Sequence, residues 1–233
     1  MSRPKGTCVY CGTFGPLHMD HVPPQNLFER HSRPNLITVP CCRKCNNAAS
    51  KDDEYLLVFF ALREDAKLQP EHANLWQKCR RILKRKEASK FRQTVVAKVK
   101  FVQPVTSTGI ILPSALSIPI DGLRVSNIIV RIVKGLYFHE RTQRFPDTYL
   151  VIAHDVLALH QPPPIERMVE ISHLRTFISQ LQTARSTCVG KIFTYRWDSD
   201  PDQPANTMWL LDFFDGIQFF CITRQSGRNL LER

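Results

Sequence analysis

The sequence predicts an α+β fold, because helical and strand-like patterns follow one another after a cysteine-rich N-terminal segment. Apolar side chains recur three and four positions apart over residues 122–138, which is typical of the buried face of a helix. A second helix is expected after three prolines, over residues 165–181. Strands are expected at residues 149–153, 191–197, 207–213 and 217–223, the last two joined by a turn at Asp215-Gly216.

The cysteine-rich segment holds two Cys-x-x-Cys pairs, Cys8 with Cys11 and Cys42 with Cys45. A tight turn can direct both sulfurs of such a pair at one ion. Four thiolates suit a closed, tetrahedral structural zinc site. Cys41 could compete for the same ion, but the spacing of the first pair favours Cys42 over Cys41.

Polar residues that zinc does not require lie between and just after these pairs: Asp20-His21, Asn35 and Asn46-Asn47. A neutral imidazole can accept a proton from water near pH 7. A carboxylate and an amide carbonyl can hold Mg²⁺ or Mn²⁺ while leaving positions open for phosphate and water. Asp20 and His21 are adjacent, so in a strand they face opposite sides. We therefore expect a backbone bend if both act on one phosphate.

The segments Asp20-His21-Val22-Pro23, Asn35-Leu36 and Cys42-x-x-Cys45-Asn46 resemble the HNH endonucleases. The resemblance covers residues 1–60 and implies a small ββα-metal unit stapled by zinc. It implies that Asp20 binds a catalytic divalent metal and that His21 is the general base. Asn35 would brace the loop and orient His21, and Asn46 would be the second metal ligand, with Asn47 as the alternative.

Three segments are expected: this nuclease-like module over residues 1–60, a basic amphipathic helical segment over 61–92, and an α+β domain of unknown role over 93–233. The middle segment has a helix beginning near Pro70, where a proline is well tolerated. Its polar face is basic and would contact phosphates without reading bases. The basic residues of this face are Lys78, Arg81, Lys84 and Arg85.

A helix that closes the nuclease-like module is expected to begin near Ser50, because a small polar residue is followed there by acidic residues. Asp52 and Asp53 would then lie in its first turn, where the helix dipole favours them. A role for these two acids at the metal site is the less favoured interpretation.

The charge distribution favours a nucleic-acid partner. Residues 1–100 carry 19 Lys and Arg against 9 Asp and Glu, whereas residues 101–233 carry 13 against 12. A localised basic field can neutralise a phosphate backbone, and DNA is the preferred substrate on this interpretation. The near-neutral second half is better suited to dimerisation or to contact with a protein partner.

No apolar stretch is long enough to span a membrane, and eight cysteines without a signal peptide argue against a secreted disulfide framework. We expect an intracellular, cytoplasmic protein of bacterial origin that does not bind membranes. Two alternatives to a nuclease stay open. One is a zinc-ribbon protein that binds nucleic acid without cutting it, and the other is a nuclease-like subunit that acts through protein assembly.

Overall fold

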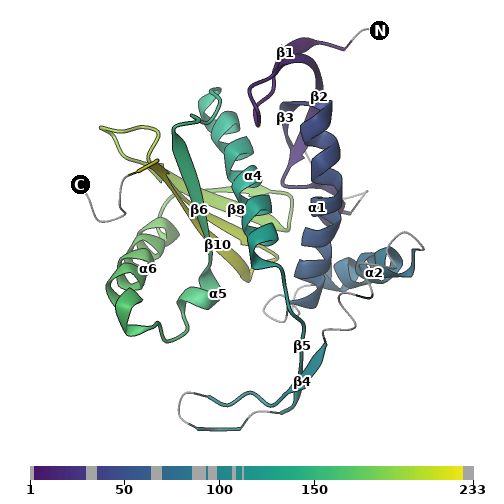
Figure 1. Ribbon diagram of the computed structural model, residues 1–233, viewed down its shortest axis with the longest axis vertical. Helices are drawn as coiled ribbons and strands as arrows, with labels where there is room; N and C mark the ends of the chain where they lie inside the picture. Colours follow the sequence, from purple (N-terminus) through teal and green to yellow (C-terminus); the bar gives the residue numbers. More distant parts are fainter. Residues whose placement is uncertain are drawn as a thin grey trace.

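The structure is a computed structural model that describes residues 3–29, 36–63, 70–85, 93, 99–106, 109–111 and 113–227. Its helices and strands confirm the α+β class. The sequence also predicts a strand over residues 94–102, and residues 94–98 of it lie outside the described residues, as does Asn35. In Figure 1 two long helices, α1 (Arg43–Leu62) and α4 (Gly122–Arg141), run side by side, with a small N-terminal sheet beside the upper half of α1 and a larger C-terminal sheet on the side of α4 away from α1.

The N-terminal part consists of an antiparallel sheet followed by a helix. The sheet has the order β1-β2-β3, formed by β1 (Lys5–Thr7), β2 (Phe14–Val22) and β3 (Ile37–Cys42). Strand β2 ends immediately before Pro23, which has no N–H to donate to a ladder. A short 3₁₀ helix, η1 (Gln25–Leu27), follows.

Helix α1 (Arg43–Leu62) begins seven residues earlier than the sequence predicts. The expectation of a start near Ser50 was wrong because the helix is capped by a cysteine rather than by a small polar residue. The Cys42 sulfur accepts a hydrogen bond from the Cys45 backbone N–H at 3.5 Å, which satisfies one donor of the first turn. The second cysteine pair therefore forms the helix N-terminus.

The C-terminal part is built on a five-stranded antiparallel sheet with the order β6-β10-β9-β8-β7. Its strands are β6 (Tyr149–Asp155), β7 (Ser186–Val189), β8 (Phe193–Ser199), β9 (Thr207–Phe213) and β10 (Ile217–Gln225). Four of these confirm predicted strands, and β7 is additional. The turn between β9 and β10 has positive φ angles at Phe214 and Asp215, as a tight hairpin requires.

Both faces of this sheet are covered. Leu210 and Phe220 face α5 (Val156–Leu159) and α6 (Met168–Gln182), and they belong to the smaller of two cores. A short 3₁₀ helix, η3 (Ile165–Arg167), directly precedes α6. Their strand neighbours Trp209 and Cys221 face the opposite way, into the larger core. This alternation explains why β9 and β10 are apolar almost throughout, as strands covered on both sides are.

Helix α4 (Gly122–Arg141) lies between the two sheets. It contacts β2, β3 and α1 on one side and β6 and β10 on the other. The predicted apolar stripe of this helix is confirmed, since all seven of its residues are buried: Val125, Ile128, Ile129, Ile132, Val133, Leu136 and Tyr137. The Asp121 side chain caps its first turn, and Thr142 ends it in the left-handed region. The larger core runs across α4, so residues on both sides of position 92 share it. The division at residues 60 and 92 stays a prediction.

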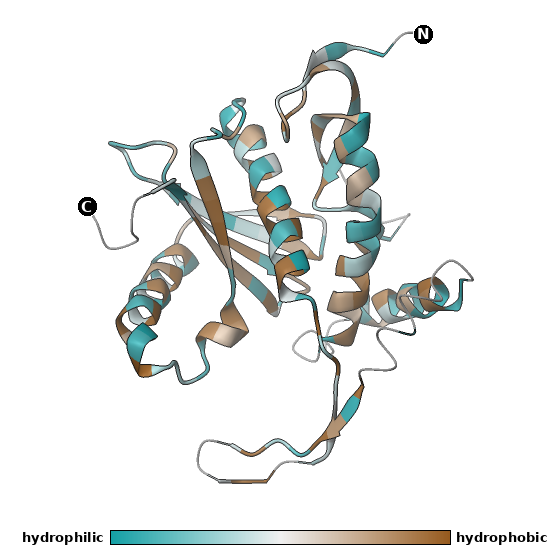
Figure 2. Cartoon of the chain, in the orientation of Figure 1, coloured by the Kyte–Doolittle hydropathy of each residue, from teal (hydrophilic) through white to brown (hydrophobic). Residues whose placement is uncertain are grey.

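Helix α2 (Pro70–Lys84) confirms the predicted amphipathic helix and packs on α1. Strands β4 (Lys100–Val102) and β5 (Ala115–Ser117) form a two-stranded arm that extends from the body (Figure 1), with apolar segments along it (Figure 2). Phe101 on this arm is 82% exposed. Among the residues that the structure describes, no helix has the length and hydropathy needed to cross a bilayer.

Replacing Phe60 with alanine should test the shared core. Phe60 is fully buried on α1, with its ring 4.7 Å from that of Phe213 in β9, so the substitution leaves a cavity between the two parts. We expect a loss of about 3–5 kcal/mol of unfolding free energy in denaturant titrations. Phe101→Ala, on the exposed arm, should change it by less than about 0.5 kcal/mol. A small effect of Phe60→Ala would mean that the two parts are stabilised separately.

Candidate functional site

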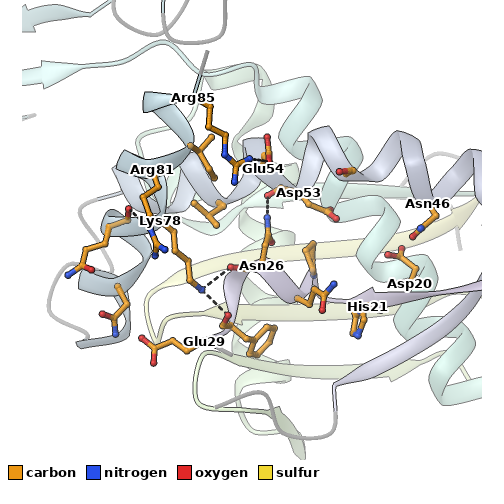
Figure 3. A pocket seen from close by; sticks show the side chains of 18 of the residues that line it. Asp20, His21, Asn26, Glu29, Asn46, Asp53, Glu54, Lys78, Arg81 and Arg85 are labelled. Atoms are coloured by element: carbon orange, nitrogen blue, oxygen red, sulfur yellow. Dashed lines mark hydrogen bonds and ion pairs between the residues drawn. The ribbon is translucent and has the colours of Figure 1, made fainter. Parts of the chain in front are cut away.

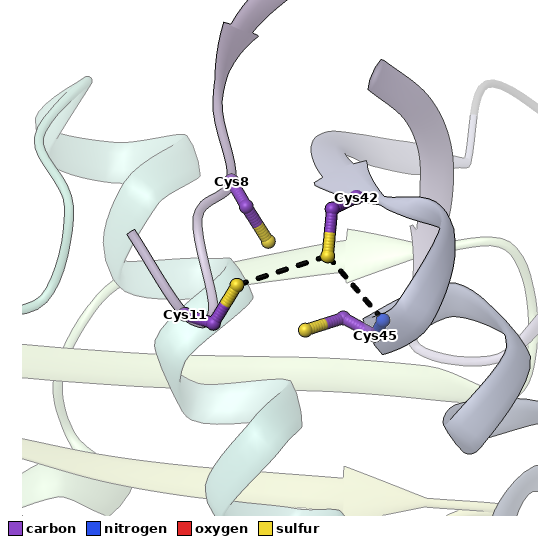
Figure 4. A group of neighbouring side chains, drawn as sticks. All are labelled: Cys8, Cys11, Cys42 and Cys45. Carbon is purple, nitrogen blue, oxygen red and sulfur yellow. Dashed lines mark hydrogen bonds between the residues drawn. The ribbon is translucent and has the colours of Figure 1, made fainter. Parts of the chain in front are cut away.

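The four predicted zinc ligands come together at one end of the N-terminal sheet (Figure 4). The sulfurs of Cys8, Cys11, Cys42 and Cys45 all lie within 4.8 Å of one another. The Cys11 and Cys42 sulfurs are 3.7 Å apart, close to the separation of about 3.8 Å that tetrahedral zinc with bonds of about 2.3 Å imposes. These four cysteines could therefore bind a structural metal such as zinc.

The surroundings of Cys11 and Cys45 shift the pKa values of these two thiols in opposite directions. The hydrogen bonds between Cys11 and Thr13 lower the pKa of the Cys11 thiol to about 6. Burial, followed by hydrogen bonds with the sulfurs of Cys42 and Cys11, raises the pKa of the Cys45 thiol above its usual value. The first pair is closed by a tight turn in which the Gly12 N–H donates to the Cys8 carbonyl, with Gly12 at a φ of 73°.

Cys41 is not part of this cluster. Its side chain is fully buried on the core side of β3, together with Ile37 and Val39, as alternation along a strand dictates. Burial raises the pKa of the Cys41 thiol to about 12, so this residue stays a neutral core thiol. The preference for Cys42 over Cys41 agrees with this arrangement.

A second feature is a cleft of about 730 Å³ between β2, η1, α1 and α2. Figure 3 shows Asp20, His21 and Asn46 at one end of it and the basic side chains of α2 at the other. The charged and amide residues that line it include Asp20, His21, Asn26, Glu29, Asn46, Asp53, Glu54, Lys78, Arg81 and Arg85. Residues from four separate elements thus meet in one cleft.

Asp20 and His21 both line the cleft although no bend occurs between them. They pair in regular register with Val39 and Thr38 of β3, and Asp20 is buried whereas His21 is half-buried. Strand β1 pairs with β2 only up to Pro16, so within the described residues this stretch of β2 has a strand partner on one side alone. Neighbouring side chains on opposite faces can therefore both border a cleft at the open edge.

The carboxylate of Asp20 is held by two other elements. The Tyr10 hydroxyl donates to Asp20 Oδ2 at 2.8 Å, and Arg131 Nη1 of α4 lies 3.5 Å from the same oxygen. Arg131 also pairs with Asp53 of α1, so one guanidinium lies between two carboxylates. Burial, with Asp20 adding to it, raises the pKa of Tyr10 above its usual value, so the phenol stays a hydrogen-bond donor.

The prediction that Asp52 and Asp53 are first-turn acids was wrong, since both lie midway along α1. Each pairs instead with an arginine of α4: Asp52 with Arg124 at 2.8 Å and Asp53 with Arg131. The two arginines are seven residues apart, which places them on one face of the helix. Asp53 also lines the cleft, and burial raises the pKa of its carboxyl to about 6, although Arg131 opposes this shift.

The asparagines that follow Cys45 are separated by the helix. Asn46 lines the cleft and Asn47 is not among the lining residues, because consecutive helical residues point about 100° apart. The helix thus places Asn46, and not Asn47, in the cleft together with Asp20. Asn35, the other asparagine of the motif, lies outside the described residues.

The basic face of α2 has several partners within the protein. The Lys78 ammonium donates to the backbone carbonyls of Asn26 at 3.0 Å and Phe28 at 2.8 Å, fastening the loop around η1 to α2. Arg85 pairs with Glu54 at 2.7 Å. Arg81 is exposed and lines the cleft, whereas the exposed Lys84 is not a lining residue. Of the four, Arg81 has the geometry best suited to contact a ligand in the cleft.

Sequence reasoning missed Tyr10 and Arg131 as parts of the site, and it gave Asp53 a role there only as the less favoured interpretation. In the sequence, Arg131 stands out only as a charged residue beside the apolar stripe of its helix. In comparisons with known proteins, no protein-family model, curated protein or solved structure matches the chain. The function must therefore be argued from the site itself.

Two serine variants, one at Cys42 and one at Cys41, test which cysteines bind zinc. Cys42→Ser should remove a ligand and the cap of α1, so we expect loss of bound zinc and unfolding of the N-terminal part, since zinc binding in a small unit contributes to folding. Cys41→Ser should retain one zinc per chain, measured by elemental analysis together with circular dichroism. Zinc loss from the Cys41 variant alone would reverse the assignment.

A pH titration tests the buried Asp53. Its pKa in the folded protein, about 6, exceeds the unfolded value of 3.8, so the folded state binds the proton more tightly. Its ionisation therefore lowers stability progressively between about pH 4 and 6, and by a constant amount above that range. The unfolding free energy of the wild type relative to Asp53→Asn should fall by at most about 3 kcal/mol across this window. If the unfolding free energies of the two proteins changed with pH in the same way, Asp53 would not have the raised pKa.

Proposed function

We propose that the chain is a metal-dependent endonuclease of the HNH type that hydrolyses phosphodiester bonds of nucleic acid, with DNA as the preferred substrate. One observation carries the proposal: Asp20, His21 and Asn46 line the same cleft as the basic residues of α2. A non-catalytic zinc ribbon has no use for these three side chains at one end of a groove. Strands β2 and β3 are followed by helix α1, and four cysteines connect the turn before β2 to the start of α1. This arrangement is compatible with a ββα-metal unit.

The donor set at this end of the cleft fits a hard divalent cation. Asp20 Oδ2 is engaged by Tyr10 and Arg131, while Oδ1 accepts no hydrogen bond from the described residues. The amide oxygen of Asn46 is a second ligand of the kind that Mg²⁺ and Mn²⁺ prefer. When bound, such an ion would polarise the scissile phosphate and stabilise the leaving oxygen.

The protein residues have separable roles in this proposal. His21, half-buried on β2, acts as the general base that takes a proton from the attacking water. Arg81 and Arg85 hold neighbouring phosphates at the other end of the cleft, and Lys78 fixes the loop that forms its wall. Asn35 keeps its proposed role of orienting His21.

Plasmid nicking by purified protein with Mg²⁺, Mn²⁺ or EDTA is the direct test. We expect metal-dependent nicking that His21→Ala lowers by at least about 100-fold, because a general base contributes about 10²–10⁴ in rate. His18→Ala is the matched control: His18 lies on the same strand, outside the cleft, and hydrogen-bonds to Arg3. It should retain wild-type activity.

Other outcomes would change the proposal. Salt-sensitive DNA binding without cleavage would favour the non-catalytic binding protein. Equal activity in wild type and His21→Ala would remove His21 from the mechanism. Neither binding nor cleavage would leave a subunit that acts through protein assembly.

A further inference from the structure

Tyr10 connects the two centres of this protein. It lies between Cys8 and Cys11, inside the first cysteine turn, and its hydroxyl reaches Asp20 Oδ2 at 2.8 Å. A single hydrogen bond from Tyr10 thus connects the first cysteine turn to a residue that lines the cleft. Tyr10 is half-buried and packs against the larger core.

The cysteine turn fixes where the Tyr10 ring can lie. The Cys8 N–H donates to the Thr13 carbonyl at 3.0 Å, and the Val9 N–H donates to the Pro40 carbonyl of β3 at 3.0 Å. With both sulfurs of the turn held in the cluster, the residues between them have little freedom. The Tyr10 side chain is thereby anchored at its backbone by the cluster and at its tip by Asp20.

Helix α4 closes the other side of the ring. A Cβ atom placed on Gly135 would lie 3.4 Å from the Tyr10 hydroxyl and 2.6 Å from Val22 Cγ2, so a larger residue there would crowd this contact. The absence of a side chain at Gly135 lets α4 approach β2. The same helix supplies Arg131, which faces Asp20 Oδ2 from another direction.

These contacts leave one defined orientation for the Asp20 carboxylate. Its Oδ2 atom is held by Tyr10 and faces Arg131, which leaves Oδ1, an oxygen that accepts no hydrogen bond from the described residues, for a ligand in the cleft. Residues that hydrogen-bond to a metal ligand orient it and raise its effective affinity for the metal. A hydrogen bond to an ionised carboxylate is stronger than one between neutral groups.

We propose that Tyr10 is a positioning residue through which the four-cysteine centre sets the affinity of the divalent-cation site. Its hydroxyl holds Asp20 in the orientation that binds the cation, and the cysteine cluster holds Tyr10. This inference rests on the proposed function, since it takes Asp20 as the cation ligand. It goes further by giving the zinc centre a role in catalysis in addition to folding.

Tyr10→Phe tests the inference because it removes one oxygen and keeps the ring. Mn²⁺ affinity is measured on the purified, zinc-loaded protein by electron paramagnetic resonance, and nicking is followed across a series of Mn²⁺ concentrations. We expect Mn²⁺ affinity about 10- to 100-fold weaker than in the wild type, the range typical of lost partners of metal ligands. Nicking should recover at saturating Mn²⁺, with one zinc per chain retained.

Tyr195→Phe is the matched control. The Tyr195 hydroxyl also donates to a carboxylate, that of Glu140, and its ring is fully buried, but it does not line the cleft. This variant should bind Mn²⁺ as the wild type does. Asp20→Asn should weaken Mn²⁺ binding more than Tyr10→Phe does.

The outcomes separate this inference from the function on which it rests. Wild-type Mn²⁺ affinity in zinc-replete Tyr10→Phe overturns the inference and leaves the nuclease proposal standing. Loss of zinc from Tyr10→Phe also overturns it, because the hydroxyl would then support the cysteine centre instead. Absence of Mn²⁺ binding to the wild type overturns both.

Discussion

The pairing of Arg131 with Asp20 and Asp53 is the interaction on which the arrangement of the two parts depends. The side chains of Arg131, Asp20 and Asp53 are 16%, 8% and 20% exposed, so three charges are largely removed from water. Such burial is tolerable only when the charges face one another, and removing one partner typically costs about 3–5 kcal/mol. The pairing therefore holds α4 against β2 and α1, and it connects two residues that line the cleft to a helix of the C-terminal part.

The four-cysteine cluster acts at shorter range. It joins the turn before β2 to the end of β3 and the beginning of α1. Cys8 and Cys41 are the fully buried cysteines there, and only Cys8 belongs to the cluster. Because Cys42 is at once a cluster member and the cap of α1, the direction in which α1 leaves the sheet depends on the cluster. That direction places Asn46 opposite Asp20.

The parts of this structure that the sequence predicts are those set by local patterns. The spacing of apolar residues located α4 to within three residues, and the two Cys-x-x-Cys pairs identified the cluster. The start of α1 was missed because its cap is a cysteine, which reads as a metal ligand and not as a helix signal. Asp53 and Arg131 are 78 residues apart, and no local pattern pairs a helix acid with one particular arginine. The sequence therefore indicates which types of residue form the site, but it does not indicate which of them pair with one another.

The charge of the cleft differs from what the basic N-terminal half suggests. Four carboxylates, those of Asp20, Glu29, Asp53 and Glu54, line it beside three basic side chains, and one of the bases is already paired with Glu54. A polyanion would meet repulsion at the Asp20 end of such a groove unless a cation lies there, since like charges in a partly buried site repel strongly. In the proposed function, a divalent ion on Asp20 would reverse the sign of that end. Cation binding and phosphate binding are then coupled, and each should strengthen the other.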